Sequence, residues 1–323
     1  MKQLVNKMCM TIVGPTACGK TERALEVARL LVKEKKVTGV DIVSADSRQV
    51  YKGLEILTGA DVPEGFEAVT LPLAQYDSYK PQSGLLYFLN VDDSVRIFGI
   101  SMIAPADEWS LAHFVNYSRE VIQKSWSNGR QPILVGGTGL YHKHLFSDDS
   151  TPQIPQDLIF RKKAEKLSVE NLQQWLAEID SMRLDQMNES DRENPRRIIR
   201  AIEVATWQKK HGDSPHGESK SSESPIIWSQ VENQVEFLTA PLEIIKERIE
   251  QRVQRRFISG AVEEVQDLLE LNLPDSSPVL TTLGVPEIRQ YLDGSLPADD
   301  CKKLWSLHEF QYAKRQLTWW KKI

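Results

Sequence analysis

The chain has 323 residues, of which 41% are hydrophobic and 26% are charged, and its formal net charge at pH 7 is −5. These values are typical of a soluble globular protein, and no apolar run approaches the ~18 residues that a membrane span needs. Three well-separated cysteines exclude a disulfide framework, and the first residues show no secretory signal. We therefore expect a cytoplasmic protein that does not enter a membrane.

The N-terminal half alternates between apolar runs and amphipathic stretches. Residues 8–13 form a short apolar run, as in a buried parallel strand, and residues 20–36 carry apolar side chains at helical spacing. Residues 40–44 are predicted to form a second strand and residues 132–135 a third, buried one, with a helix predicted at 109–128 between them. This alternation predicts a parallel α/β sheet with right-handed crossovers.

Other segments are less regular. Alternation near residues 95–100 predicts a strand, with a loop or hairpin around it. Residues 157–210 are charged and helical in pattern, whereas residues 211–225 are rich in Ser, Gly and Pro and predict a surface loop. A returning strand is predicted at 235–239, and residues 297–323 read as a helix.

The residues that follow the first predicted strand match the phosphate-binding pattern G-x-x-x-x-G-K-[ST]. They are Gly14, Pro15, Thr16, Ala17, Cys18, Gly19, Lys20 and Thr21. In such a loop the backbone N–H groups surround an anion at a helix start, the lysine contacts the terminal phosphate and the last hydroxyl holds Mg²⁺. The pattern predicts a phosphate site, but it does not choose between kinases, NTPases and other phosphate chemistry.

Two more strand ends carry residues suited to a site. Asp46, Ser47, Arg48 and Gln49 follow the second predicted strand, at the edge where ligands bind in parallel sheets. Asp46 there is a candidate Mg²⁺ ligand or general base, with a turn-capping role as the alternative. The glycines of 136–139 follow the third strand and would let backbone and the Thr138 hydroxyl approach a ligand closely.

Basic residues cluster in the C-terminal half of this acidic chain, around 192–200, 246–256 and 302–322. Each cluster alone is equally well explained as a solvated helix face. Three of them together favour a nucleic-acid partner.

Six segments in order resemble the tRNA dimethylallyltransferase (tRNA isopentenyltransferase) family. They are Gly14–Thr21, Asp46–Tyr51, Gly136–Tyr141, Asn194–Val204, Arg248–Val265 and Ala313–Trp319. The resemblance spans almost the whole chain. It implies a P-loop NTPase-like parallel sheet flanked by helices, formed by residues 1–146 and 196–323, with an inserted all-helical tRNA-binding subdomain at 147–195.

The resemblance also implies an activity. An enzyme of this family transfers a dimethylallyl group from dimethylallyl diphosphate to the exocyclic amine of the adenosine next to the anticodon of tRNA. Gly14–Thr21 would hold the donor's diphosphate, with Mg²⁺ on Thr21, and Lys20 and Arg252 would stabilise the leaving group. Asp46 would accept the amine's proton, and Thr138 would help hold the target base.

Contacts to tRNA are implied at two places, with further contacts expected near 281–286. The residues concerned are Asp46, Ser47, Arg48, Gln49, Thr138, Asn194, Pro195, Arg196, Arg197 and Ile198. No feature demands more than a monomer, which is the state we expect.

The chain departs from the family pattern in three places. Cys18 stands where serine is common, Gly284–Glu287 replaces Gly-Tyr-Lys-Glu, and an extended 77–104 region lacks a typical His-His pair. Two other enzymes remain open: an adenylate isopentenyltransferase that uses free AMP, ADP or ATP, and a small-molecule kinase. A non-catalytic RNA-binding module is a further alternative, which would not need Lys20, Thr21 and Asp46 together.

Overall fold

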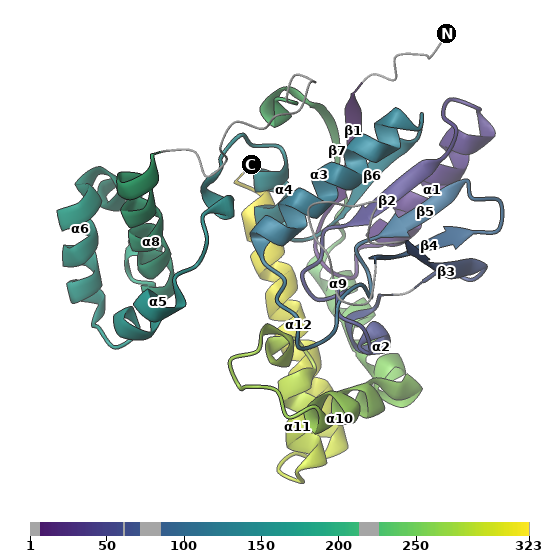
Figure 1. Cartoon of the computed structure of the whole chain (residues 1–323). Helices are drawn as coiled ribbons and strands as arrows, with labels where there is room; N and C mark the ends of the chain where they lie inside the picture. The colour runs from purple at the N-terminus through teal and green to yellow at the C-terminus, as the bar shows by residue number, and fades with distance from the viewer. Residues whose placement is uncertain (1–6, 61, 72–84, 213–225, 323) are drawn as a thin grey trace. The chain divides into compact units, whose positions relative to one another are not determined.

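One seven-stranded sheet organises the larger part of the chain, in a computed structural model that describes residues 7–60, 62–71, 85–212 and 226–322 (Figure 1). The strand order is β3-β4-β5-β2-β6-β1-β7. The strands are β1 Met8–Val13, β2 Val40–Ser44, β3 Phe66–Leu71, β4 Leu85–Asn90, β5 Val95–Phe98, β6 Gln131–Gly136 and β7 Glu232–Phe237. Strands β5, β2, β6, β1 and β7 are parallel, whereas β3 and β4 add an antiparallel edge.

The register brings the predicted site segments to one edge. Val13 at the end of β1 pairs with Gly136 at the end of β6, and Ser44 at the end of β2 pairs with Val135. The segments that begin at residues 14, 45 and 137 therefore leave the sheet side by side, as expected for parallel strands.

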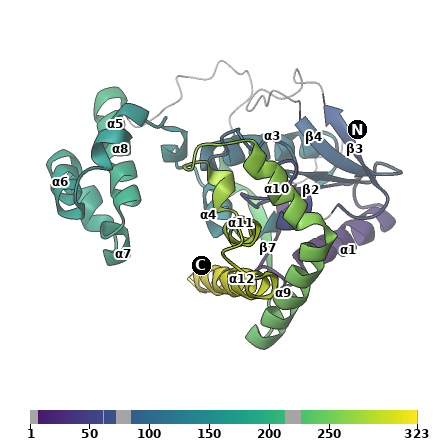
Figure 2. The same cartoon turned by 90° about the horizontal axis from the view of Figure 1, so that it is seen from below.

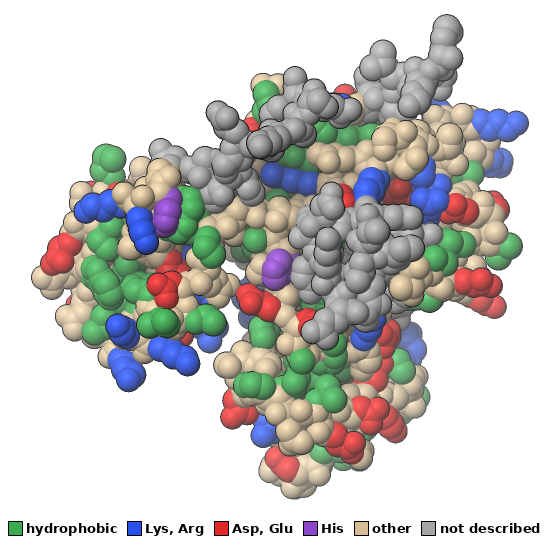
Figure 3. All heavy atoms as spheres, viewed as in Figure 1, with side chains coloured by type: hydrophobic (Ala, Val, Ile, Leu, Met, Phe, Trp, Pro, Cys, Tyr) green, Lys and Arg blue, Asp and Glu red, His purple; other side chains and the backbone are tan. Residues whose placement is uncertain are grey.

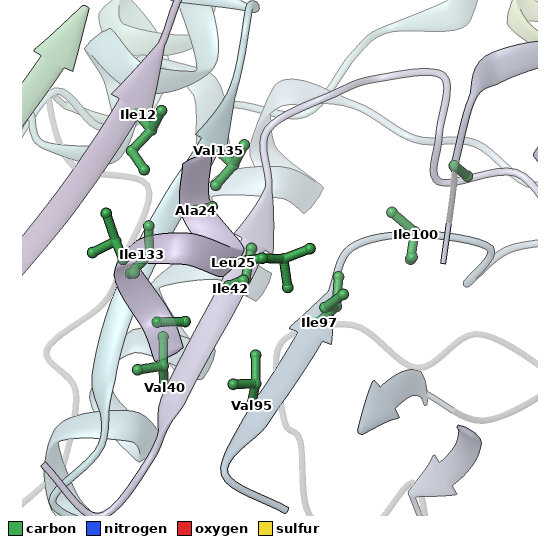
Figure 4. Close-up of a cluster of buried hydrophobic side chains, with 13 residues drawn as sticks. Ile12, Ala24, Leu25, Val40, Ile42, Val95, Ile97, Ile100, Ile133 and Val135 are labelled. Carbon is green, nitrogen blue, oxygen red and sulfur yellow. The ribbon is translucent and has the colours of Figure 1, made fainter. Parts of the chain in front are cut away.

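Helices α1 (Lys20–Lys33) and α3 (Leu111–Ser127) cover opposite faces of the sheet. Asp41 contacts Ser125 of α3, whereas the next residue, Ile42, packs in the same core as α1, and neighbouring strand residues point to opposite faces. Figure 4 shows this core, in which Ala24 and Leu25 of α1 lie among Ile and Val side chains of four strands. The burial of nearly all of β2 and β6 explains why most of their side chains are apolar.

One charge of β2 is buried against α3. The Asp41 carboxylate accepts hydrogen bonds from Arg130 Nε at 2.6 Å and from the Ser125 hydroxyl at 2.7 Å. Arg130 also donates to the carbonyls of Val40 and Asp93, so the charged side chains are fully engaged. A carboxylate buried in this way needs its partners, because desolvation of an unpaired charge is costly.

The remaining helices of this unit are α2 Glu55–Thr58, α4 Gly139–Leu145, α9 Leu242–Arg256, α10 Val262–Glu270, α11 Val285–Leu292 and α12 Ala298–Trp320. The long helix α12 packs along α9, and the two run together in both views (Figures 1 and 2). Helix α12 also contacts α4 and α11. The last predicted helix therefore supports the elements around the sheet edge.

Residues 147–227 form a second compact unit, made of helices α5 Leu158–Ala164, α6 Val169–Gln186, α7 Glu189–Arg192 and α8 Pro195–His211. Its core includes Leu172 and Leu176 of α6 and Ile198 and Ile202 of α8. The unit extends beyond the insertion expected at 147–195, because α8 buries its apolar face in the same core. Helix α8 thus belongs with the inserted helices and not with the sheet.

The strands predicted in the N-terminal half and the all-helical pattern of 157–210 are confirmed. The alternation near residues 95–100 is β5, which pairs in parallel with β2 on one side and antiparallel with β4 on the other. Most of the predicted loop at 211–225 and part of the 77–104 region lie outside the described residues. Within the described ranges, no helix is long and apolar enough to cross a membrane.

Candidate active site

The loop between β1 and α1 has the backbone of a phosphate-binding turn. Gly14, Ala17 and Gly19 have positive φ angles of 153°, 64° and 90°. A Cβ atom on Gly14 would lie 2.1 Å from the carbonyl oxygen of Leu238, so only glycine fits there. Left-handed residues alternating with right-handed ones let successive N–H groups converge on an anion, and the start of α1 adds its dipole.

The side chain of Lys20 is held over this loop by a backbone carbonyl of the loop. Its Nζ donates to the carbonyl of Pro15 at 2.6 Å and lies 4.0 Å from Cys18 Sγ. Burial lowers the pKa of Lys20 below its ordinary 10.5, while the nearby charge of Asp46 opposes this shift. A half-buried ammonium that lines the cavity is well suited to receive an anionic ligand.

A cavity of about 460 Å³ opens beside the loop. Its polar lining includes Thr16, Lys20, Thr21, Asp46, Gln49, Arg248, Arg252, Arg255, Arg256, Tyr312 and Gln316. Its apolar lining includes Ile42, Ala60, Ile97, Ile100 and Val135, which also belong to the hydrophobic core (Figure 4). The cavity therefore joins a cationic end to an apolar wall.

The cationic end comes mainly from α9. Arg248, Arg252 and Arg256 are spaced by four residues, which puts them on one face of the helix. Arg252 donates to the Thr16 hydroxyl at 2.9 Å, and Arg248 lies 3.4 Å from the carbonyl of Ala17. These contacts tie α9 to the phosphate-binding loop.

Helix α12 supplies a second set of polar groups. Gln316 accepts a hydrogen bond from the backbone N–H of Thr16, and Glu309 pairs with Arg252. Burial raises the pKa of Tyr312 to about 12, and the nearby charge of Asp46 adds to this effect. The phenol is therefore neutral at physiological pH.

Asp46 lines the cavity from the turn after β2. Its Oδ1 accepts the backbone N–H of Arg48 at 2.8 Å and lies 3.4 Å from that of Gln49. Gln49 is fixed in turn by the Ser44 hydroxyl and by the carbonyl of Gly59. Asp46 thus caps the turn after β2 and also lines the cavity.

Arg48 points elsewhere. Its guanidinium donates to the carbonyl of Pro278 and to the Thr281 hydroxyl, in the short helix η5 (Pro278–Thr281). Ser47 does not line the cavity either. In the 281–286 region, Val285 is buried and Pro286 is exposed, so only part of this predicted RNA surface is open to solvent.

Thr138 lies at the N-cap of α4 and does not line the cavity. Its hydroxyl is buried and lies beside the phenol of Tyr312, which does line the cavity. The glycines around it let α12 approach, since a Cβ on Gly137 would lie 2.1 Å from the Gln316 side chain and one on Gly139 1.7 Å from Trp319. The absence of side chains on these glycines therefore lets α12 pack closely, in addition to leaving room for a ligand.

In the helical unit, the predicted tRNA-binding residues differ in exposure. Asn194 caps α8 through the backbone N–H groups of Arg196 and Arg197. Pro195, Arg196 and Arg197 are exposed, and Arg197 pairs with Asp191. Ile198 is fully buried in the core of the unit, so its side chain supports the helix and offers no surface. Figure 3 shows basic side chains on the surface of this unit.

Several functional candidates were not singled out from the sequence. Gln316 and Glu309 contact the loop and Arg252 from the far end of the chain. Gln316 lies in Ala313–Trp319, one of the six segments that resemble the family, and that resemblance could have pointed to it. No sequence pattern points to Glu309. The sequence indicated Arg256 only as one member of the basic cluster at residues 246–256.

A metal ion would find few protein ligands here. The described residues hold no group of three or more His, Cys, Asp or Glu side chains that could bind one. Thr21 and Asp46 do line the cavity with oxygen atoms. Mg²⁺ commonly takes one or two protein ligands and completes its shell with water and substrate phosphates, so these residues fit that ion.

Comparison with known proteins agrees with this geometry. The family model "IPP transferase" matches residues 91–323. A tRNA dimethylallyltransferase of an Exiguobacterium species is 33% identical over 316 residues, covering 97% of this chain and 86% of the relative. One of Acetivibrio thermocellus is 32% identical over 318 residues, covering 97% and 88%.

Solved structures are similar as well. The full-length tRNA isopentenylpyrophosphate transferase of Bacillus halodurans matches with a TM-score of 0.59 at 26% identity, covering 98% of this chain and 88% of the other. A eukaryotic dimethylallyltransferase acting on tRNA matches with a TM-score of 0.68 at 20% identity, covering 97% and 70%, and shows the same fold.

Proposed function

Because this chain belongs to the tRNA dimethylallyltransferase family of IPP transferases, we propose that it transfers a dimethylallyl group from dimethylallyl diphosphate to the exocyclic amine of an adenosine in tRNA. The adenosine is the one on the 3′ side of the anticodon. The observation that carries this proposal is the single cavity in which Lys20, Asp46 and an apolar wall meet.

The cationic end of the cavity suits a diphosphate. Lys20 and the arginines of α9 line it, and the loop Gly14–Thr21 has the backbone of an anion site. When the bond between carbon and the bridging oxygen of the donor breaks, the electron pair leaves with the diphosphate. Lys20 and Arg252 stabilise that growing charge, which lowers the barrier.

The apolar wall suits the five-carbon group. Ile97, Ile100 and Val135 would contact the dimethylallyl chain and exclude water from its reactive carbon. Exclusion of water matters because an allylic carbon with cationic character would otherwise be hydrolysed.

Asp46 accepts the proton in this mechanism. The exocyclic amine forms a bond to the allylic carbon as the bond to diphosphate breaks, and its proton passes to the Asp46 carboxylate. The Asp46 backbone contacts keep the carboxylate in place without consuming both oxygens, since the two N–H groups use Oδ1. The adenine must leave its stack to reach the cavity, so a flipped nucleotide is required.

The Thr21 hydroxyl would hold Mg²⁺, and Asp46, which lines the same cavity, would offer a second oxygen. When bound, the ion would neutralise charge on the diphosphate. The protein groups around it perform the positioning and the proton transfer.

Two observations favour this function over the alternatives. The backbone N–H of Thr16 already donates to Gln316, which leaves one donor fewer in the loop for the third phosphate of a nucleoside triphosphate. The helical unit with exposed Arg196 and Arg197 would be superfluous for a free mononucleotide acceptor. We propose a monomer that binds the anticodon stem-loop.

The decisive experiment supplies labelled dimethylallyl diphosphate with bulk tRNA or with AMP. Label on tRNA adenosine, and none on AMP, is the expected result. Label on AMP alone would overturn the tRNA assignment in favour of an adenylate isopentenyltransferase. Label on neither, with phosphoryl transfer from ATP to a small molecule, would favour the kinase.

A further inference from the structure

Glu309 is a buried carboxylate next to the cavity that the mechanism above does not use. It lies on α12, with 4% of its surface exposed, on the side that packs against α9. Its carboxylate accepts hydrogen bonds from Arg252, from Arg256 NH1 at 3.3 Å and from Trp305 Nε1 at 3.0 Å.

The two arginines need such a partner. Arg252 and Arg256 are one helical turn apart on α9, and like charges at this spacing repel. Both side chains are largely buried, with 20% and 10% of their surface exposed. A carboxylate between them offsets the repulsion and leaves one net positive charge, so both guanidinium groups can stay beside the cavity.

Arg252 carries the effect to the phosphate site. The same nitrogen that pairs with Glu309 also donates to the Thr16 hydroxyl in the loop. Arg252 Nε is buried and has no hydrogen-bond partner among the described residues, although the side chain lines the cavity. The guanidinium is therefore fixed through Nη2 to both Glu309 and the loop, beside the cavity that its side chain lines.

Arg256 is fixed in the same way on the other side of the carboxylate. Its guanidinium passes over Gly59, where a Cβ atom would lie 1.7 Å from its NH2. Arg256 and Gly59 both line the cavity. Glu309 and Gly59 together define where this second charge can lie.

We propose that Glu309 is a positioning residue for the transfer reaction, holding Arg252 and Arg256 at the end of the cavity that receives the leaving diphosphate. This inference rests on the proposed function. Glu309 does not touch the reacting atoms. It acts by fixing two positive charges before the substrate arrives, so that no reorganisation is needed when the diphosphate charge develops.

The test substitutes Glu309→Gln, which keeps the shape of the side chain but removes its charge. We expect binding of inorganic diphosphate, measured by calorimetry, to weaken about 10-fold or more, and kcat to fall about 10- to 100-fold. The KM for tRNA should stay as in the wild type, because the acceptor does not contact this cluster. Glu309→Asp keeps the charge with a shorter reach, should retain more binding than the glutamine variant, and serves if that variant does not fold.

Glu203→Gln is the matched control. Glu203 is likewise a buried carboxylate that pairs with two arginines, Arg161 and Arg200, but it belongs to the helical unit and does not line the cavity. Its substitution should cost similar stability without changing diphosphate binding. If Glu309→Gln also loses only thermal stability, the positioning role is overturned.

Coupling to the two arginines separates positioning from an independent effect. If Glu309 acts through Arg252 and Arg256, adding Glu309→Gln to a variant with both Arg252→Met and Arg256→Met should weaken diphosphate binding no further. A further loss in that triple variant would overturn the proposal. Absence of diphosphate binding by the wild-type protein would overturn the proposed function as well, whereas wild-type binding by Glu309→Gln would overturn this inference alone.

Discussion

The side-chain oxygen of Gln316 accepts a hydrogen bond from the backbone N–H of Thr16 at 2.8 Å, although the two residues are 300 positions apart. The phosphate-binding loop is therefore completed by the last helix of the chain. Gln316 is 94% buried, so its amide cannot be replaced by water without cost.

Gln316→Ala should accordingly weaken the phosphate site. The Thr16 N–H would lose its acceptor, and loss of a buried hydrogen bond costs about 1–3 kcal/mol. We expect diphosphate affinity in calorimetry to fall about 10-fold. Gln290→Ala is the control, because Gln290 is exposed and its side chain donates to the Pro286 carbonyl of its own helix. Equal affinities for the two variants would contradict the role of Gln316.

Asp46→Asn should separate binding from turnover. The amide oxygen of asparagine can still accept the N–H of Arg48, so the turn after β2 should keep its shape. The variant loses the proton acceptor, and kcat should fall about 10²- to 10⁴-fold. Diphosphate and tRNA binding should stay near wild type; full turnover would exclude Asp46 as the general base.

Lys20→Met should stabilise the protein without ligand and abolish its response to diphosphate. Burial lowers the pKa of Lys20 from 10.5, so between the folded and unfolded values the unfolded chain binds more protons. Stability from this group is therefore reduced at low pH and recovers as the pH rises toward 10.5.

Thermal unfolding across pH measures this effect. The methionine variant should have the higher Tm at pH 7, and the gap should narrow as the pH rises. A lower Tm for the variant at pH 7 would contradict this prediction. It would show that other groups of the ligand-free protein already stabilise the Lys20 charge. Lys36→Met serves as the control, because Lys36 is exposed.

Arg196→Ala should weaken tRNA binding without affecting diphosphate. Arg196 is exposed at the start of α8. If it contacts a phosphate, the slope of log affinity against log salt should fall by about one unit. An unchanged slope would remove Arg196 from the RNA surface.

The local features of this protein were predictable from the sequence. The phosphate-binding loop at Gly14–Thr21 was predictable because its glycines and its lysine lie within eight consecutive residues. The buried strands β2 and β6 were also predictable, because burial on both faces leaves mostly apolar side chains in each strand. Asp46 followed from its place at the end of a parallel strand.

Features that depend on packing between distant elements were not predictable. Glu309 and Gln316 reach the site only because α12 packs along α9 and α4, and the spacing of residues within α12 does not reveal its neighbours. The inclusion of α8 in the helical unit was missed for a similar reason. The first residues of α8 are basic and do not indicate which unit the helix packs in. Its place in the helical unit depends on Ile198 and Ile202, which are buried against α6.

The wall of the cavity has one further consequence. Ile42, Ile97 and Val135 are at once the lining of the donor site and part of the core that joins the sheet to α1 (Figure 4). A shorter side chain there would make room for a longer isoprenoid, but each such truncation also removes about 2–5 kcal/mol of folding free energy. Evolution or engineering of this enzyme toward bulkier donors would thus have to raise stability elsewhere first, so that donor length and thermal tolerance change together.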